Sequence, residues 1–568
     1  MRRLALMVAL ATGGFGSAVV AQTGVQTGAQ TSGFSIAVNS NADAIAPDSD
    51  LTLREALSIA NGSLTPDQLS AAERSLVTAA QTSTIRFQLP AGQTVIRLKS
   101  ALPDIVRSLV IDGTTQAGYG TTQLFSEIPY LRQPVVEITP DTGTTILRGL
   151  TITADDVVVK GLSLYGFTGA FSETAPTPPA DIFIAHRNPP PALVSEDPNR
   201  PFKHNQPFEY VTPPKNVQIL DNWLGIRPDQ SMPDTSSAFG VSIFNGDRVT
   251  VQNNWIANHD GSGIISSVNA TNSVISQNTI VANGLAGMPD AIRLEGNIDA
   301  SRITENLMCG NDGSAVYLFK PTGSVTVDKN RMVYNGRRLR RSAVYLMGND
   351  HKVLNNTIED QTASGVTVAA NPNSYRNEIS GNKFARLEGL SIDLNTWNST
   401  DVSDQQRGDG INPQRDSGNR RKETGNAAIN APKFSDRIFP LTNKQTSITG
   451  YADAGTTVKL YRVAVGSRAP YAGPLTEELF TTQTKANGSF EINVDNGFRA
   501  GDVISAVAFD PRYGTSEPAI NARLGLGKSE RRSMTSGRSK TIAPAFPPVS
   551  PRRPHRRPSL CCRRSRSS

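Results

Sequence analysis

The sequence predicts an all-β protein built as a right-handed parallel β-helix, and three observations predict it. Asparagines recur at intervals of 24 to 32 residues, each after a short aliphatic run, and a second apolar run separates each asparagine from the next. The runs are rich in Val, Ile, Tyr and Thr, which is typical of strands. The recurring residues are Asn222, Asn254, Asn278, Asn306, Asn330, Asn356 and Asn382.

Each repeat contains a strand, a turn and another strand, which is too short for a propeller blade and unlike a leucine-rich repeat. In a parallel β-helix, coils stack about 4.8 Å apart and their strands pair with both neighbours. An asparagine at one bend of every coil can bond the asparagines above and below, and it tolerates the left-handed conformation. We therefore expect the series to be structural, within one continuous solenoid from about residue 135 to residue 392.

The first residues have the features of a secretory signal. Arg2 and Arg3 precede an apolar run that ends in small residues before Gln22. We expect residues 1–21 to be a signal peptide and residues 22–33 a linker. The mature chain is then exported, and is secreted, periplasmic or on the outer cell surface. No later stretch has the apolar length needed to span a bilayer.

Residues 34–80 are expected to cap the N-terminal end of the solenoid. Thr52 and Glu55 have capping-box spacing before a short amphipathic helix, and a second helix is expected to begin at Thr65 with Pro66 at its first position. The open end of a β-helix exposes unpaired strand edge and apolar core. An amphipathic helix at this position covers both, so it is expected to have a structural role.

The segment LTLREAL resembles the LREA-type motif near the start of many exported bacterial right-handed β-helix proteins, where a cysteine often stands at the position of Thr52. TIRFQLPAGQTVIRLKSALPDI, SLVIDGTTQAGYG and ILRGLTITADDVVVKGLSLYGF are similar to the same pectate-lyase-like family. The resemblance implies a β-helix for residues 34–433. It selects no function, because the superfamily contains lyases, glycoside hydrolases, epimerases, adhesins and surface proteins.

Two interruptions and a change of period complete the expected organisation. Residues 172–215 contain proline clusters and are expected to leave the solenoid as one long loop, a candidate lid. Residues 393–421 resemble the acidic loop that closes the last coil in this family. Residues 434–525 contain alternating strands between turn residues, which indicate a small antiparallel sandwich and resemble immunoglobulin-like modules.

The net charge of +7 comes from the basic tail, residues 526–568, and from the leader. Without them, 43 basic and 49 acidic residues leave the folded body near −6, which argues against a nucleic-acid partner for that body. The tail is expected to be disordered. The tail either binds an anionic surface or is an extension that has not been selected for a function, and the second interpretation is favoured. Cys309 is expected to be a small core residue, and no disulfide is expected.

One flat face of the solenoid is the candidate site, because outward side chains form ladders along it. Aromatic rings pack on sugar rings, and Arg or carboxylate groups bond hydroxyls or uronates, so Tyr317 and Tyr345 are the candidates to bind a sugar chain. An ordinary exposed sheet is the favoured interpretation of this face, because Tyr and Thr are good strand residues. One expected file contains Arg293, Tyr317, Tyr345, Thr367 and Ser391, and the file beside it contains Glu295, Phe319, Met347, Ala369 and Asp393.

Two chemistries are open if this face is catalytic. A lyase needs a group that neutralises a uronate, a base and an acid. Arg293 or Lys320 can neutralise or abstract, Tyr317 can donate, and Glu295 or Asp290 can hold a cation. A hydrolase needs paired carboxylates, and Asp290 with Glu295 is the pair expected on this face.

Calcium is the one possible cofactor that the sequence suggests. Asp393, Asp404 and Asp409 lie in the expected closing loop, and calcium takes six to eight oxygen ligands. The spacing matches no EF-hand or nonapeptide repeat, so solvated turn carboxylates are favoured. His259 and His351 lie in turn segments, where an exposed histidine is more often inert than a general base.

The leading hypothesis is an exported surface or envelope protein that binds an acidic polysaccharide and processes it as a lyase or hydrolase if it is an enzyme. The alternative is a non-catalytic adhesin or structural surface protein. A catalytic site needs an acid, a base and a cation ligand in one cleft, whereas an adhesin does not. We expect a monomer.

Overall fold

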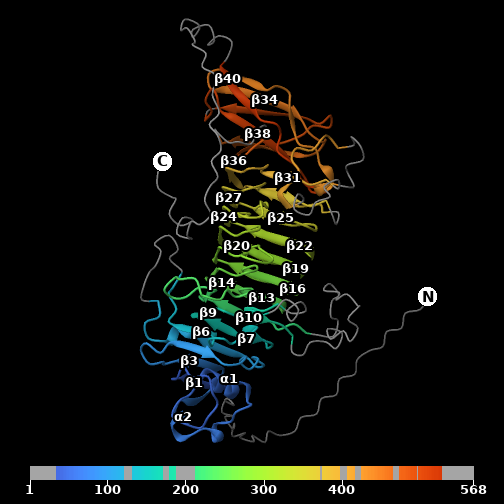
Figure 1. The fold of residues 1–568 in the computed structure, drawn as a ribbon. Coiled ribbons are helices and arrows are strands. Elements are labelled where there is room, and N and C mark those ends of the chain that lie inside the picture. The colour runs from blue at the N-terminus through green and yellow to red at the C-terminus, as the bar shows by residue number, and fades with distance from the viewer. Residues whose placement is uncertain are drawn as a thin grey trace, which may run out of the picture.

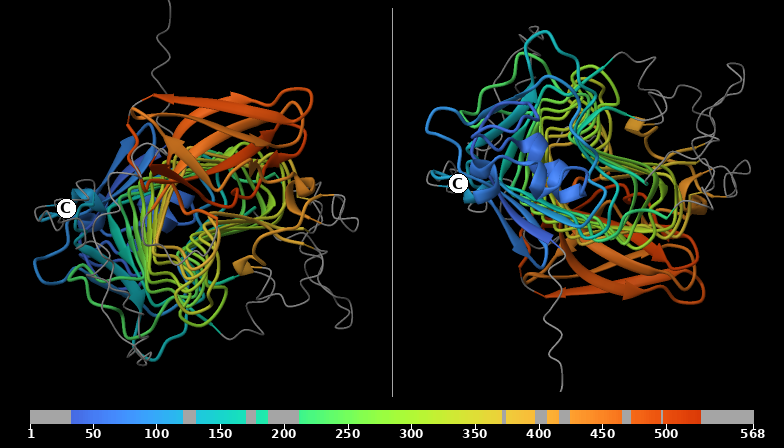
Figure 2. Two further views of the ribbon diagram at one scale, coloured as in Figure 1. Left: turned by 90° about the horizontal axis from the view of Figure 1, so that it is seen from above. Right: turned by 90° about the horizontal axis from the view of Figure 1, so that it is seen from below.

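The protein is a parallel β-helix, which confirms the predicted fold class. Its coils stack along one axis, with short helices at one end and mostly antiparallel strands at the other (Figure 1). Seen along that axis, three sheets surround a common interior (Figure 2). The structure is a computed structural model that describes residues 33–120, 131–169, 178–186, 212–370, 374–396, 406–415, 424–464, 472–495 and 497–526.

Each regular coil has three strands, one in each of sheets A, B and C, whereas the sequence predicts two. The ladder asparagine separates a strand of sheet A from a strand of sheet B, so one apparent aliphatic run is two strands around a bend. All neighbours pair in parallel except β1 and β2, which are antiparallel.

Sheet A contains β1 (Gly33–Val38), β2 (Val77–Ala80), β3 (Ser83–Phe87), β5 (Leu109–Asp112), β8 (Val158–Lys160), β11 (Gln218–Leu220), β14 (Thr250–Gln252), β17 (Val274–Ser276), β20 (Ser301–Thr304), β23 (Val325–Asp328), β26 (Lys352–Leu354) and β29 (Glu378–Ser380). Sheet B contains β4 (Val95–Leu98), β6 (Val136–Pro140), β9 (Leu162–Leu164), β12 (Trp223–Leu224), β15 (Trp255–Ala257), β18 (Thr279–Val281), β21 (Leu307–Cys309), β24 (Arg331–Val333), β27 (Thr357–Glu359) and β30 (Lys383–Ala385). Sheet C contains β7 (Arg148–Ile152), β10 (Ala180–Ile184), β13 (Val241–Asp247), β16 (Ile264–Thr271), β19 (Ile292–Asn297), β22 (Val316–Thr322), β25 (Val344–Leu346), β28 (Val366–Val368) and β31 (Ile392–Leu394).

The asparagine ladder lies at the bend between sheets A and B, as predicted. Asn278 donates from its side-chain amide to Asn306 Oδ1 at 3.0 Å, and Asn306 donates to Asn330 Oδ1 at 2.9 Å. The ladder residue itself does not take the left-handed conformation. The residue before it does, with φ of 55° at Gln277 and 57° at Glu305.

A second ladder, which the sequence analysis missed, lies at the bend between sheets B and C. Asn283 donates to Asn311 Oδ1 at 3.0 Å and Asn311 to Asn335 Oδ1 at 2.8 Å. His259 continues this ladder, with Nδ1 at 2.8 Å from Asn283 Oδ1. His351 and His259 are both fully buried, so the expectation that they are exposed turn histidines is wrong.

The N-terminal helices follow the capping pattern only in part. In α1 (Leu53–Asn61), Thr52 and Glu55 form the predicted capping box, and the apolar face joins the main core. The helix predicted at Thr65 is one 3₁₀ turn, η1 (Pro66–Gln68), followed by α2 (Ala71–Ser75). Another 3₁₀ turn, η2 (Gly113–Thr115), follows β5.

Residues 172–215 are not one excluded loop, which corrects the prediction. Within them, Ala180–Ile184 forms strand β10, which pairs with β7 and β13 in sheet C. This segment contains no proline and keeps its backbone N–H groups for pairing, so it returns to the solenoid between the proline clusters. Residues 170–177 and 187–211 lie outside the described part of the chain.

The C-terminal strands form two sheets around one apolar core, which includes Val458, Phe490 and Leu524. All pairs are antiparallel except β33 with β40. The 3₁₀ segment η5 (Gly425–Ala428) precedes them. The strands are β32 (Lys433–Phe434), β33 (Ile438–Leu441), β34 (Gln445–Tyr451), β35 (Thr457–Val463), β36 (Leu475–Gln483), β37 (Ser489–Asp495), β38 (Val503–Asp510), β39 (Gly514–Thr515) and β40 (Ala522–Leu526).

These sheets cover the C-terminal end of the solenoid (Figure 1). Tyr461 and Val507 pack into the main core of the β-helix. Gly514 of β39 bridges Asn377 beside the last strand of sheet A, and the Thr515 hydroxyl accepts from Ile379 N at 2.8 Å. The C-terminal sheets therefore cap the open end.

Cys309 lies in an apolar cluster separate from the main core and is disulfide-bonded, so the expected absence of disulfides is wrong. Sequence spacing alone could not reveal the pairing. Cys561 and Cys562, the expected signal peptide and the basic tail all lie outside the described residues. Among the described residues, no helix has the length and apolar character needed to cross a membrane.

Candidate functional site

The predicted outward file lies on sheet C. Arg293 pairs with Tyr317, Tyr317 with Tyr345, and Tyr345 with Thr367. The predicted last member is wrong by two residues, because Thr367 pairs with Asp393 rather than Ser391. The file beside it still contains Glu295 and Phe319, which pair with each other, but Asp393 is not in it.

The tyrosines of this file are buried, which overturns the expected exposed sugar platform. Tyr317 and Tyr345 are 3% and 1% exposed, and they stack at 5.1 Å with an interplanar angle of 12°. They point away from the solenoid core and form an apolar cluster of their own with Met347 and Ala369. A strand pattern gives the direction of a side chain but not what later segments place over it.

Arg293 is the centre of the candidate site. Its Nη1 lies 3.5 Å from Asp290 Oδ2 and its Nε lies 3.9 Å from Glu295 Oε1. Its guanidinium carbon lies 4.6 Å from the centre of the Tyr317 ring and 4.7 Å from that of Phe319. Four predicted site residues, Asp290, Arg293, Glu295 and Tyr317, therefore lie together.

The two carboxylates of this cluster differ in their availability. Asp290 is fully buried, accepts from Ser314 N at 2.8 Å and pairs with Arg341 at 3.3 Å. Glu295 has a side chain that is 19% exposed, and burial raises the pKa of its carboxyl although Arg293 partly offsets the rise. Glu295 is therefore the acid that a ligand can reach.

An arginine-rich loop, residues 337–341, lies beside this cluster and was missed in the sequence analysis. Four arginines in five residues, RRLRR, were the available signal. Arg341 lies 5.7 Å from the Tyr317 ring, which brings the loop to the predicted site. Arg337 and Arg338 both pair with Asp312, at 2.7 and 2.8 Å, so one carboxylate faces two cations.

The predicted calcium ligands do not form a metal site in the described chain. Asp393 is a buried residue of strand β31, not a loop residue, and Asp409 accepts from Thr396 N and Oγ1 at 2.9 and 2.7 Å. Within the described ranges, no group of three His, Cys, Asp or Glu side chains could hold a metal ion. Asp404 lies outside those ranges, as does the side chain of Lys320.

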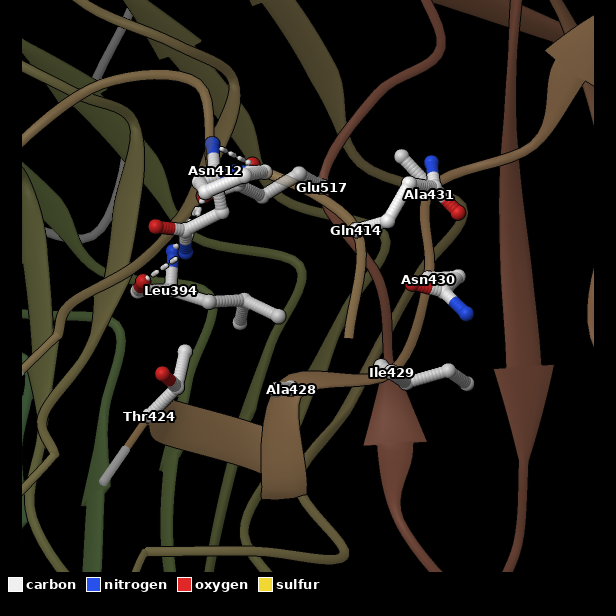
Figure 3. Close-up of a pocket in the computed structure, with 10 residues that line it drawn as sticks. Leu394, Asn412, Gln414, Thr424, Ala428, Ile429, Asn430, Ala431 and Glu517 are labelled. Atoms are coloured by element: carbon white, nitrogen blue, oxygen red, sulfur yellow. Dashed lines mark hydrogen bonds between the residues drawn. The ribbon is translucent and has the colours of Figure 1, made fainter. Parts of the chain in front are cut away.

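The end of the solenoid holds a small cavity of about 20 Å³ beside Glu517 (Figure 3). Both carboxylate oxygens of Glu517 are occupied, because Leu394 N donates at 3.1 Å and Asn412 donates from its backbone N at 2.8 Å. The volume suits about one water molecule. This cavity belongs to the junction between solenoid and C-terminal sheets rather than to a ligand site.

A buried Ser237–Asp181–His259 chain is structural as well. Ser237 donates to Asp181 at 2.5 Å, and His259 Nε2 lies 2.8 Å from the other carboxylate oxygen. A nucleophilic triad requires the hydroxyl on the imidazole, whereas here it is on the carboxylate. Ser237 also accepts from Gly166 N at 2.8 Å, which ties a bend together.

No family model matches the chain, and no curated protein matches it. Among solved structures, PfbA, a surface adhesin of Streptococcus pneumoniae, is 13% identical, with a TM-score of 0.32 over 55% of this chain and 80% of that one. DFA-IIIase from Arthrobacter chlorophenolicus A6 is 14% identical, with a TM-score of 0.33 over 56% and 68%. The A-module of the mannuronan C-5 epimerase AlgE6 from Azotobacter vinelandii is 14% identical, with a TM-score of 0.33 over 55% and 79%. At TM-scores below 0.5, these similarities assign no activity to this chain.

Proposed function

We propose that the protein binds an acidic polysaccharide on the face of sheet C beside the arginine-rich loop. The observation that carries this proposal is the local charge. Among the described residues, five arginines gather where four carboxylates, those of Asp290, Glu295, Asp312 and Glu388, pair with them, although the folded body as a whole is acidic. Arg forms bidentate bonds with carboxylate or sulfate groups, so such a patch suits an anionic glycan.

The exposed arginines are placed to meet a ligand from solution. The side chains of Arg338 and Arg340 are 48% and 61% exposed. The pair of Arg340 with Glu388, whose side chain is 55% exposed, is a surface pair that contributes about 0–1 kcal/mol to stability, so a competing anion can take over Arg340 at small cost. The leader-like N-terminus supports an exported location, where such polysaccharides occur.

Binding without catalysis is favoured over hydrolysis. A hydrolase needs two carboxyl groups that flank the bond to be broken. Asp290 is fully buried and pairs with Arg293 and Arg341, so Glu295 is the one accessible carboxyl in the described part of this cluster. Glu295 beside Arg293 does favour a second candidate function, a polysaccharide lyase, because a carboxyl with a raised pKa can act as an acid next to a cation that neutralises a uronate.

The test compares Arg340→Gln with Arg302→Gln, an exposed arginine that pairs with Asp328 on sheet A. Affinity for a polyuronate, measured by calorimetry at low salt, should fall several-fold in the first variant only and should weaken with salt in the parent. Equal affinity in both variants would refute the proposal. Ultraviolet absorbance of unsaturated products and reducing ends in the same samples decides between binding and cleavage.

A further inference from the structure

Residues 406–412 run along the outer side of the last strands of sheet C, and we name them the strap. Ser342 holds the start of the strap, since its N and Oγ donate to the Gln406 carbonyl at 2.9 and 2.7 Å. One coil further on, Ser364 N donates to the Arg407 carbonyl at 3.3 Å. These two amide protons therefore report directly on whether the strap is in place.

The second half of the strap is tied to the end of the solenoid. The N–H groups of Asp409 and Gly410 donate to Asp393 at 3.1 Å each. Asn412 then bonds Glu517 of the C-terminal sheets, with its N at 2.8 Å from Oε2 (Figure 3). The strap thus spans three coils.

The strap contacts both ends of the part of the outward file that runs from Tyr317 through Tyr345 and Thr367 to Asp393, and we name this part the aromatic file. Gln406 Nε2 donates to the Tyr317 hydroxyl at 3.2 Å, and Asp393 is bonded as described above. Tyr345 and Thr367 lie between these two contacts in register and are 1% and 0% exposed.

The cover matches the file poorly. The strap contributes polar side chains and two glycines, and its one large apolar side chain, Ile411, is 46% exposed. Thr367 Oγ1 and Gln406 Oε1 are buried, yet neither has a hydrogen-bond partner among the described residues. Buried polar atoms are normally bonded, so these two atoms point to an absent partner.

We propose that the aromatic file beneath the strap is a subsite for a sugar ring of the acidic polysaccharide, and that the strap lifts to admit it. A pyranose ring offers an apolar face to Tyr345 and hydroxyl groups to Thr367 and Gln406, which supplies what the strap does not. Lifting the strap exposes the rings of Tyr317 and Tyr345, and the apolar face of a bound pyranose covers them again. This inference rests on the proposed function and adds regulated access to the same face.

Gly408 provides a selective way to dislodge the strap. Its φ is 91°, and a Cβ at this position would overlap the Asp393 carboxylate and the Ser364 hydroxyl. Gly410 is the matched control, with the same φ of 91° but no atom within 4 Å of the added carbon. Gly408→Ala and Gly410→Ala therefore share the backbone strain, and only the first has the clash.

The expected result is that Gly408→Ala binds the polyuronate several-fold more tightly than the parent and Gly410→Ala binds as the parent does. Tyr317→Phe keeps the ring, loses the bond to Gln406 and should also bind more tightly. Residue-resolved hydrogen–deuterium exchange should show faster exchange at Ser342 and Ser364 when the polyuronate binds the parent. The Val344 amide, which donates to Gly365 within sheet C, serves as the internal reference and should not change.

Unchanged or slower exchange at Ser342 and Ser364 in the bound parent, or no gain in affinity in either variant, would overturn the subsite. The Arg340→Gln result separates this failure from that of the proposed function. If binding depends on Arg340 but the strap does not move, only the subsite is wrong. If no polyuronate binds and the strap-opened variants do not bind either, both proposals are wrong.

Discussion

Asn306 shows at the scale of one residue how the solenoid is held together. Its amide donates to Asn330 Oδ1 at 2.9 Å and to the carbonyls of Ile275 and Thr304 at 2.9 and 3.0 Å. Its Oδ1 accepts from both the backbone and the side chain of Asn278 at 3.0 Å. One buried side chain therefore bonds its own coil and both neighbouring coils.

We predict that Asn306→Ala lowers the free energy of unfolding by about 1–3 kcal/mol, because buried donors and acceptors in the neighbouring coils lose their partners. Chemical denaturation followed by circular dichroism measures the change. Asn297→Ala is the control, since Asn297 is exposed at the end of β19 and should shift stability by less than about 0.5 kcal/mol. Equal effects of the two substitutions would contradict a special role of the ladder.

Asp393 predicts a pH dependence of stability. Burial, together with the neighbouring Asp409 carboxylate, raises the pKa of its carboxyl to about 8. The folded chain then holds a proton that the unfolded chain releases near pH 4, so the free energy of unfolding falls as the pH rises from about 4 to 8 and levels off above.

We predict that Asp393→Asn makes the unfolding midpoint less dependent on pH in that window. Asp350→Asn is the comparison variant, because the pKa of Asp350 is shifted in the opposite direction. A hydrogen bond from Arg376 holds the pKa of the Asp350 carboxyl below its usual range, so its stabilisation is lost only as the pH falls through the acidic range. Unfolding midpoints from pH 3 to pH 9 test both, and a pH profile of Asp393→Asn identical to that of the parent would show that Asp393 is not protonated in the fold.

At the scale of an element, helix α1 depends on its first residue. Thr52 accepts from Glu55 N at 3.2 Å while Glu55 accepts from Thr52 N at 2.9 Å, and the helix covers the N-terminal end of the core. We predict that Thr52→Ala costs about 0.5–2 kcal/mol of stability. Thr65→Ala, at the exposed single turn η1, should cost clearly less by the same denaturation measurement. The reverse order would mean that α1 is not needed to close this end.

The repeat was predictable from the sequence because it is a local pattern. A short apolar run beside an asparagine recurs whatever the rest of the chain does, so strands, capping box and ladder could be read directly. The third sheet was missed because the bend at the asparagine divides a run that looks continuous. The register error at Ser391 has another origin: Ser391 and Asp393 lie two residues apart and share one face, so the alternation in SIDL does not select which of them pairs with Thr367.

The candidate site was less predictable, because it depends on contacts between segments distant in sequence. Periodicity brought Arg293, Glu295 and Tyr317 to one face correctly. It could not show that residues 406–412 lie over Tyr317, since the strap follows that tyrosine by almost ninety residues and has no strand pattern. The arginine-rich loop was visible in the sequence but lay at a bend, outside the ladders that the strand pattern defines.

At the scale of the whole molecule, the two ends of the solenoid need different covers. Helix α1 closes the first coil, and the C-terminal sheets close the last one through Tyr461, Val507 and the Glu517 bonds to Leu394 and Asn412. A stacked solenoid has apolar core and unpaired strand edges at each open end, so a cap that covers each end contributes to the stability of the solenoid.

We predict that a chain ending at residue 432 unfolds at a lower temperature and self-associates, because sheets A, B and C then present β29, β30 and β31 as open edges. Thermal unfolding and light scattering measure the two effects. Tyr451→Ala in the full chain is the control: Tyr451 is 57% exposed on the outer side of the C-terminal sheets, so its loss should leave both measurements unchanged. If the shortened chain stays monomeric with an unchanged midpoint, the C-terminal sheets are an independent unit, and their contacts with the last coil contribute nothing to the stability of the solenoid.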